Sequence, residues 1–231
     1  MDSFQVYRDI KARTDGEIYL GVVGPVRTGK STFIKRFADL LILPNLTDVH
    51  KKERTKDELP QSASGTTIMT TEPKFVPKEA VSVRLAEDVE VKIRLVDCVG
   101  YMVEGASGHT ENGAERQVKT PIPFTKAAAI GTQKVIHDHA TIGLVVTTDG
   151  SVTELARENY IPAEEKTVRE LQEIGKPFLI ILNCQKPYAE EAKSLKEELQ
   201  EKYQAPVIAM NCEQMKADDL HEMMQQILYE F

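Results

Sequence analysis

Short apolar runs alternate along the chain with stretches whose apolar residues recur at helical spacing. Buried strands are predicted where the runs are unbroken, at residues 18–23, 142–147, 178–182 and 206–210. Helices are predicted at residues 3–14, 33–41, 124–139, 163–174, 190–203 and 217–229. Strands that alternate with helices in this way imply an α/β, three-layer fold with a mainly parallel sheet covered on both faces.

Two more strands have a different pattern, in which apolar and polar residues alternate. They span residues 81–85 and 89–95, with Glu87-Asp88 between them, which predicts an antiparallel hairpin and therefore a mixed sheet. Residues 45–72 and 101–121 have no clear period, and we expect two long mobile loops there. We expect residues 1–231 to form a single domain, with residues 1–16 as an N-terminal helical extension.

Composition and charge exclude several classes of protein. The net charge of −7 argues against a general nucleic-acid-binding face and against simple attraction to an anionic bilayer. The charged N-terminus is unlike a signal peptide, and the apolar run at residues 178–182 is too short to span a membrane. Three cysteines without metal-ligand spacing indicate reduced, buried thiols, so we expect a cytoplasmic protein.

The first candidate site is Gly24-Pro25-Val26-Arg27-Thr28-Gly29-Lys30-Ser31, which reads G-x-x-x-x-G-K-S, the phosphate-binding P-loop pattern. The alternative is a chance Gly-rich turn before a helix. A predicted strand precedes the motif and a predicted helix follows it, which favours the P-loop. The glycines let successive N–H groups point at phosphate oxygens, and the helix N-terminus adds unpaired donors. Lys30 can reach the β- and γ-phosphates, and the Ser31 hydroxyl can ligate Mg²⁺. With Thr32, residues 24–32 are assigned to nucleotide binding.

A second anchor for Mg²⁺ is expected at Asp97, at the end of an apolar strand. Asp97-Cys98-Val99-Gly100 reads D-x-x-G, in which the Gly100 N–H can contact the γ-phosphate; the alternative is a solvated aspartate at a strand end. A sensing threonine should lie between the P-loop helix and the hairpin, at Thr66, Thr67, Thr70 or Thr71. Thr70 and Thr71 are favoured because they directly precede strand-like residues 74–76, and Thr70 is also assigned to the metal.

The choice of base is indicated by Asn183-Cys184-Gln185-Lys186. Guanine-specific enzymes with this arrangement carry N-K-x-D, whose aspartate accepts hydrogen bonds that guanine can donate and adenine cannot. Asn183 is present, but Lys186 stands in place of the aspartate, and a cation cannot accept those bonds. Because a site discriminates through polar groups that pair, we expect ATP rather than GTP, with Asn183 in the nucleotide site.

Two further residues near the expected phosphates are unusual. Tyr101 occupies the position at which many GTPases place a water-orienting glutamine, and a tyrosine cannot do this in the same way. Arg27 is an uncommon residue within a P-loop. Our hypothesis is that Arg27 acts as a built-in arginine finger near the β- and γ-phosphates; the alternative is an outward-facing loop arginine.

Five blocks of sequence carry a family resemblance, at residues 24–31, 57–63, 68–77, 94–101 and 147–150, and several of them are longer than general nucleotide-binding motifs. Together they resemble the stage IV sporulation protein A family of spore-coat morphogenetic ATPases. The resemblance implies ATP hydrolysis by a translation-factor-related P-loop domain, with Lys30, Asp97 and Thr70-Thr71 in the site. It also implies that hydrolysis changes the protein's shape and permits polymerisation around the forespore, on the mother-cell side. Further domains, absent here, would contact other coat and membrane-anchoring proteins.

Two other functions remain open at this stage. A conventional regulatory GTPase would prefer guanine nucleotides. A structural module would bind a nucleotide without hydrolysing it.

Overall fold

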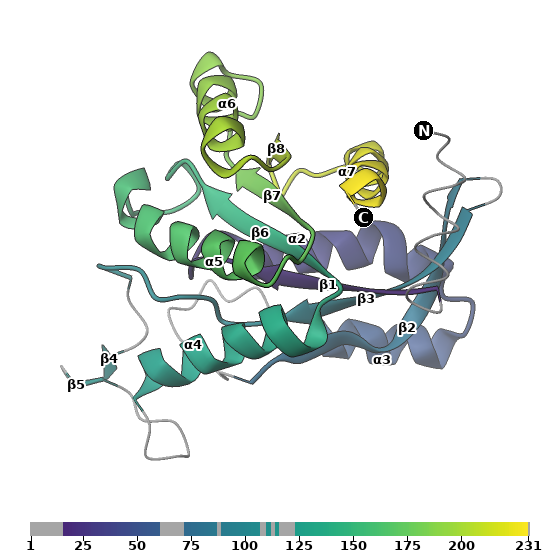
Figure 1. Cartoon of the computed structure of the whole chain (residues 1–231). Helices are drawn as coiled ribbons and strands as arrows, with labels where there is room; N and C mark the ends of the chain where they lie inside the picture. Colours follow the sequence, from purple (N-terminus) through teal and green to yellow (C-terminus); the bar gives the residue numbers. More distant parts are fainter. Residues whose placement is uncertain are drawn as a thin grey trace.

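A six-stranded sheet forms the centre of the protein, in the order β2-β3-β1-β6-β7-β8 (Figure 1). The computed structural model describes residues 16–60, 72–86, 89–106, 110–111, 114–115 and 123–230. Five strands are parallel, and β2 is antiparallel to β3 at one edge, which confirms the mixed, mainly parallel sheet predicted from the sequence. The strands are β1 (Glu17–Val23), β2 (Lys74–Ala86), β3 (Val89–Asp97), β6 (Ile142–Thr148), β7 (Phe178–Asn183) and β8 (Val207–Met210).

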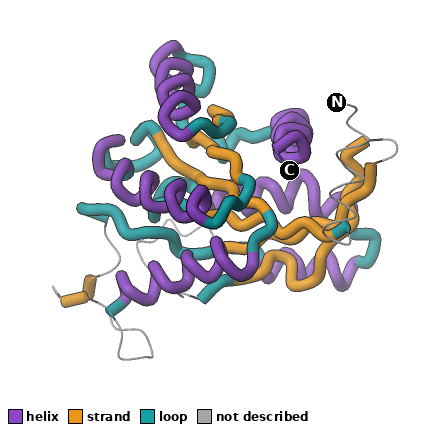
Figure 2. Tube along the Cα trace, viewed as in Figure 1, coloured by secondary structure: helices purple, strands orange, loops and turns teal. Residues whose placement is uncertain are grey.

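Helices lie on both faces of this sheet (Figure 2). One face carries α2 (Lys30–Phe37), which continues through η1 (Ala38–Ile42) and η2 (Leu43–Asn45), together with α7 (Ala217–Glu230). The other face carries α4 (Phe124–Lys134), η3 (Val135–His139), η4 (Arg157–Asn159), α5 (Ile161–Glu173) and α6 (Glu190–Tyr203). Each predicted helix that falls within the described residues is therefore present. The predicted helix at residues 3–14 lies outside them.

The alternation of side chains along the central strands produces the two core layers. In β1, Ile18, Leu20 and Val22 pack with the α2 and α7 side, whereas Val23 packs with the α5 side. In β6 every residue is buried, as expected for a parallel strand covered on both faces. Each fully buried aliphatic side chain contributes about 1.5–3 kcal/mol relative to an exposed one, so these strands form a rigid support for the loops at their ends.

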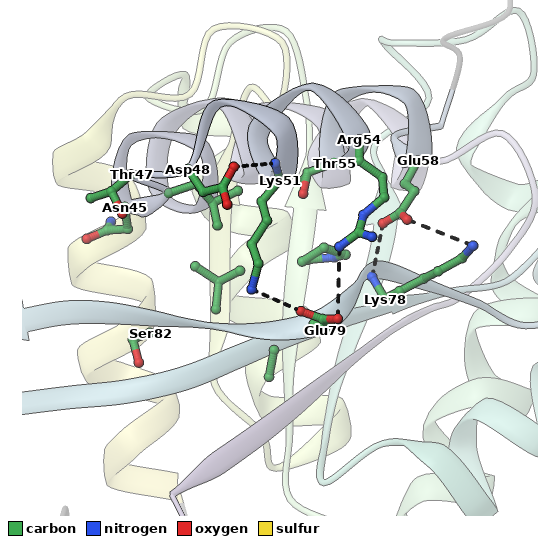
Figure 3. Close-up of a pocket in the computed structure, with 14 residues that line it drawn as sticks. Asn45, Thr47, Asp48, Lys51, Arg54, Thr55, Glu58, Lys78, Glu79 and Ser82 are labelled. Carbon is green, nitrogen blue, oxygen red and sulfur yellow. Dashed lines mark hydrogen bonds and ion pairs between the residues drawn. The ribbon is translucent and has the colours of Figure 1, made fainter.

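The prediction of one long irregular loop at residues 45–72 was wrong in part, because α3 (Val49–Glu58) lies within it. This helix has no apolar stripe, so periodicity could not reveal it; Thr55 is its buried residue. Asp48 caps its N-terminus by accepting hydrogen bonds from the backbone of His50 and Lys51. Ion pairs and a hydrogen bond then join α3 to β2: Glu79 pairs with Lys51 and Arg54, and Glu58 accepts a hydrogen bond from the Lys78 backbone N–H (Figure 3).

The interval 101–121 also contains more structure than we expected from its sequence. Two short strands, β4 (Thr110–Glu111) and β5 (Ala114–Glu115), pair there as an antiparallel hairpin. The segment that begins at Tyr101 is bridged to Pro25, so its first residue is fixed against the P-loop. Two-residue strands are too short to produce a periodic signal in the sequence.

Candidate nucleotide-binding site

The loops that follow β1, β3, β6 and β7 meet at one edge of the sheet because these strands are parallel. The register aligns their ends: Val22 pairs with Asp97, Val23 pairs with Val145, and Thr148 pairs with Asn183. The carboxyl edge of a parallel sheet is where α/β proteins bind ligands. Motifs that lie far apart in the sequence, such as Thr28 and Asn183 at a separation of 155 positions, are thereby brought to one site.

The P-loop adopts the tight conformation that its glycines allow. Gly29 has a φ of 93°, and a Cβ atom there would lie 2.3 Å from the Asn183 side-chain nitrogen. Directly after it, α2 begins at Lys30, so the first turn of this helix and its unpaired N–H groups follow the loop. Residues 24–31 therefore have the local geometry that binds phosphate.

Lys30 is buried beneath this loop rather than extended into solvent. Its Nζ donates hydrogen bonds to the carbonyl oxygens of Pro25, at 2.5 Å, and Gly24, at 3.4 Å. Burial lowers the pKa of the ammonium, whereas Cys98, when it is a thiolate, and the Asp97 carboxylate act in the opposite direction. The ammonium group is thus held within the loop, with Asp97 close enough to interact electrostatically.

Asp97 ends β3 beside the P-loop, as predicted. Burial raises the pKa of its carboxyl group to about 6, although the Lys30 ammonium pulls it down. Its Oδ1 atom is buried without a hydrogen-bond partner among the described residues. A buried carboxylate oxygen without a partner, at the end of the strand next to β1 and its P-loop, fits the oxygen ligands that Mg²⁺ takes in such sites. The third assigned ligand, Thr70, lies outside the described residues, as do Thr66, Thr67 and Thr71.

The D-x-x-G segment lies directly on the P-loop. The Tyr101 N–H donates to the Gly24 carbonyl at 3.2 Å, and the Val26 N–H donates to the Tyr101 carbonyl at 2.9 Å. A Cβ atom at Gly100 would lie 2.6 Å from the Lys30 nitrogen. Gly100 is therefore in contact with the lysine that the sequence assigns to the phosphates.

Asn183 has a role that the sequence did not reveal. Its Nδ2 donates to the Thr28 carbonyl at 2.9 Å, and its Oδ1 accepts from the Cys212 N–H at 3.0 Å. The side-chain amide of Asn183 therefore joins the P-loop to the segment after β8 and braces the P-loop. Next to it, Cys184 is buried and Lys186 is exposed, so the described loop places no carboxylate at the guanine-reading position.

Similarity to known protein families shows to which family the chain with this site belongs. The family model of the stage IV sporulation protein A ATPase domain matches residues 1–231. The chain belongs to this family. Stage IV sporulation protein A of Clostridioides difficile (strain 630) is 53% identical over 231 residues, covering 98% of this chain and 47% of that protein. The Bacillus subtilis (strain 168) protein is 51% identical over 236 residues, covering 100% and 48%.

The chain thus spans about half the length of the stage IV sporulation protein A sequences that it matches. Among solved structures, a glycine-to-serine variant of SsGBP has a TM-score of 0.50 at 15% identity, over 97% of this chain and 62% of that one. At this identity the likeness concerns the fold alone. Within the described residues, no helix is both long enough and apolar enough to cross a bilayer.

A further loop, Thr147-Thr148-Asp149-Gly150, lies at the same edge of the sheet after β6, and its sequence had indicated no role in the site. The Asp149 carboxylate accepts a hydrogen bond from the Ser151 backbone N–H at 2.8 Å. The Ser151 hydroxyl in turn accepts one from the Gln185 N–H at 2.9 Å. This loop therefore braces the segment after β7. The sequence could have indicated this role, because polar residues directly after a buried strand are typical of a loop at a binding site. Arg27, by contrast, is exposed, with a φ of 62°.

Proposed function

We propose that this domain binds ATP with Mg²⁺ and hydrolyses the bond between the β- and γ-phosphates. The observation that carries the proposal is the placement of two groups at the P-loop: the buried Lys30 ammonium, held by the Pro25 carbonyl, and the Asp97 carboxylate, which interacts with it electrostatically and whose Oδ1 has no partner among the described residues. Buried charged groups are costly unless a ligand or partner uses them, and they concentrate at functional sites. Membership of an ATPase-domain family supports the same activity.

Each part of the site then has a role in the proposed reaction. Residues 24–32 bind the phosphates through backbone N–H groups and the Lys30 ammonium; Pro25 has no N–H, and the Val26 N–H is already bonded to Tyr101. Ser31, Thr70 and Asp97 hold the metal. Mg²⁺, when bound, neutralises the negative charge that develops on the phosphate oxygens. The Gly100 N–H, together with Thr70 or Thr71, senses the γ-phosphate. Arg27 is proposed as an arginine finger; Arg27→Ala with unchanged turnover and affinity would contradict that role.

ATP is proposed as the nucleotide because Lys186 replaces the guanine-reading carboxylate. In the full-length protein, we propose that hydrolysis drives a conformational change that permits polymerisation at the forespore surface, in the mother-cell cytoplasm. Further domains of that protein would contact other coat and membrane-anchoring proteins. The lengths of the relatives, about twice that of this chain, support the existence of such domains.

The test is phosphate release with ATP and with GTP, for the wild type and for Lys30→Ala and Asp97→Ala. We expect ATP-dependent release that each substitution lowers by at least roughly a hundredfold, because each removes charge stabilisation of the transition state. Lys35→Ala, an exposed lysine on the same helix, is the matched control and should keep wild-type turnover.

Other outcomes distinguish the alternatives. Faster release with GTP, and tighter binding of a GTP analogue by isothermal titration, would indicate a regulatory GTPase. Tight binding of ATP without any release, unchanged in Lys30→Ala, would indicate a structural module and would contradict hydrolysis.

A further inference from the structure

The side chain of Tyr101, the residue after the D-x-x-G motif, packs against helix α5 and is hydrogen-bonded to it. The ring is buried, with 4% of its surface exposed, and its hydroxyl donates to Glu170 of α5. The other oxygen of Glu170 accepts from Gln133 of α4 at 3.3 Å. Lys166, also on α5, places its ammonium 4.0 Å from the centre of the Tyr101 ring. Three side chains from two helices therefore fix this ring.

The backbone of the same residue is joined to the phosphate-binding loop. Its N–H donates to Gly24 and its carbonyl accepts from Val26, so two hydrogen bonds join it to both sides of Pro25. Gly100, the preceding residue, is in close contact with the Lys30 ammonium. Tyr101 is thus a single-residue connection between α5 and the P-loop.

We propose that Tyr101 and Glu170 are positioning residues that hold Gly100 and the P-loop in the geometry that hydrolysis requires. This inference rests on the proposed function. Catalysis of phosphoryl transfer depends mainly on the fixed placement of donors around the phosphate, and small displacements are costly. Because the Tyr101 hydroxyl is bonded to Glu170, the side chain after D-x-x-G acts here as an anchor rather than as a water-orienting group.

The experiment measures kcat and KM for ATP in the full chain carrying Tyr101→Phe, Glu170→Leu, Glu170→Gln or the double variant Tyr101→Phe/Glu170→Leu. We expect Tyr101→Phe to lower kcat roughly tenfold, with KM changed by less than about twofold. Glu170→Leu should have the same effect and the double variant no larger one, because both remove one interaction. Glu170→Gln keeps an acceptor for the hydroxyl and should retain most of the activity.

Tyr188→Phe and Glu173→Leu are the matched controls, an exposed tyrosine and an exposed glutamate on α5 outside this contact. Both should have wild-type kcat. A second readout is independent of hydrolysis: amide hydrogen exchange at Val26 and Tyr101 should be faster in Tyr101→Phe, because the bonds that these amides donate, to Tyr101 and to Gly24 respectively, lose the anchor.

The outcomes separate this inference from the proposed function. If the wild type releases no phosphate, the proposed function fails, and hydrogen exchange alone decides the positioning role. If Tyr101→Phe keeps wild-type kcat and wild-type exchange, the inference is overturned while hydrolysis stands. A lowered melting temperature with unchanged kcat and exchange would mean that the contact is merely structural, which also overturns it.

Discussion

The side-chain amide of Asn183 donates a 2.9 Å hydrogen bond to the backbone carbonyl of Thr28, across 155 positions of sequence. Asn183 is 4% exposed, and its oxygen accepts from the Cys212 N–H. One amide therefore connects the P-loop, the end of β7 and the loop after β8. This arrangement explains why an asparagine can be needed at this position when the guanine-reading aspartate is absent.

Replacing Asn183 with aspartate should separate these two bonds. The carboxylate can still accept from Cys212 but cannot donate to Thr28, so two oxygens would face each other. We expect Asn183→Asp to destabilise the protein by about 1–3 kcal/mol and to weaken ATP binding. Urea unfolding and isothermal titration measure the two effects. Wild-type affinity in Asn183→Asp would contradict the bracing role.

A pair of glycines tests whether the close approach at the P-loop matters beyond backbone strain. Gly29 and Gly175 both have positive φ, 93° and 63°, but a Cβ at Gly175 would meet nothing within 4 Å, whereas one at Gly29 would meet Asn183. Gly175→Ala should cost about 1–2 kcal/mol of stability with unchanged ATP affinity. Gly29→Ala should abolish measurable ATP binding. Equal affinities in the two variants, measured by titration, would show that the close contact is unimportant.

Most of the fold could be predicted from the sequence because the central strands and their helices have strong apolar patterns. β6 and β7 are continuous apolar runs, and the β2–β3 hairpin alternates with period two, so both types of strand were identifiable. α3 was missed for the opposite reason. Its stability comes from a cap at Asp48 and from ion pairs with a strand some 25 residues later, such as Lys51 with Glu79, and such long-range pairs leave no local period.

The site was predicted where one residue's chemistry sufficed, and missed where two distant residues act together. Lys30 and Asp97 carry recognisable motifs, and the structure brings them together at one edge of the sheet. For Tyr101 the sequence predicted only that a tyrosine cannot orient water as a glutamine does; its contact with Glu170 was missed because that residue is 69 positions away. Whether Thr70 and Thr71 complete the metal site stays a prediction, since they lie outside the described residues.

A buried ion pair joins η4 to α5 and predicts a large effect on stability. Arg157 and Glu164 contact at 2.7 Å, with side-chain exposures of 14% and 0%, and Glu164 also accepts from Thr147 and Tyr203. Arg157→Ala removes one partner of a buried pair and should cost about 3–5 kcal/mol.

Lys202 and Glu165 form the matched pair on the surface, at the same 2.7 Å distance but with exposures of 37% and 39%. Lys202→Ala should therefore cost less than about 1 kcal/mol. Chemical denaturation measures both variants. Similar losses of unfolding free energy in Arg157→Ala and Lys202→Ala would show that burial does not set the strength of these pairs.

The pH dependence of stability should reveal the cost of keeping Asp97 ionised. Burial raises the pKa of this carboxyl group to about 6, above the value of about 3.9 expected in the unfolded chain. A raised carboxyl pKa means that the folded state binds the proton more tightly. The resulting stabilisation is complete below about pH 4 and is lost as the pH rises through 6.

Above pH 6, the buried carboxylate should therefore cost the folded protein about 2–3 kcal/mol in the absence of a cation ligand. Asp97→Asn keeps the shape without the charge, so it should be more stable than the wild type at pH 8 and no more stable at pH 4. Urea unfolding without nucleotide at both pH values measures this difference, with Asp48→Asn, an exposed helix cap, as the control. If Asp97→Asn were instead less stable at pH 8, the carboxylate would be a structural group, and its unpartnered oxygen could not be explained by a role in binding a metal.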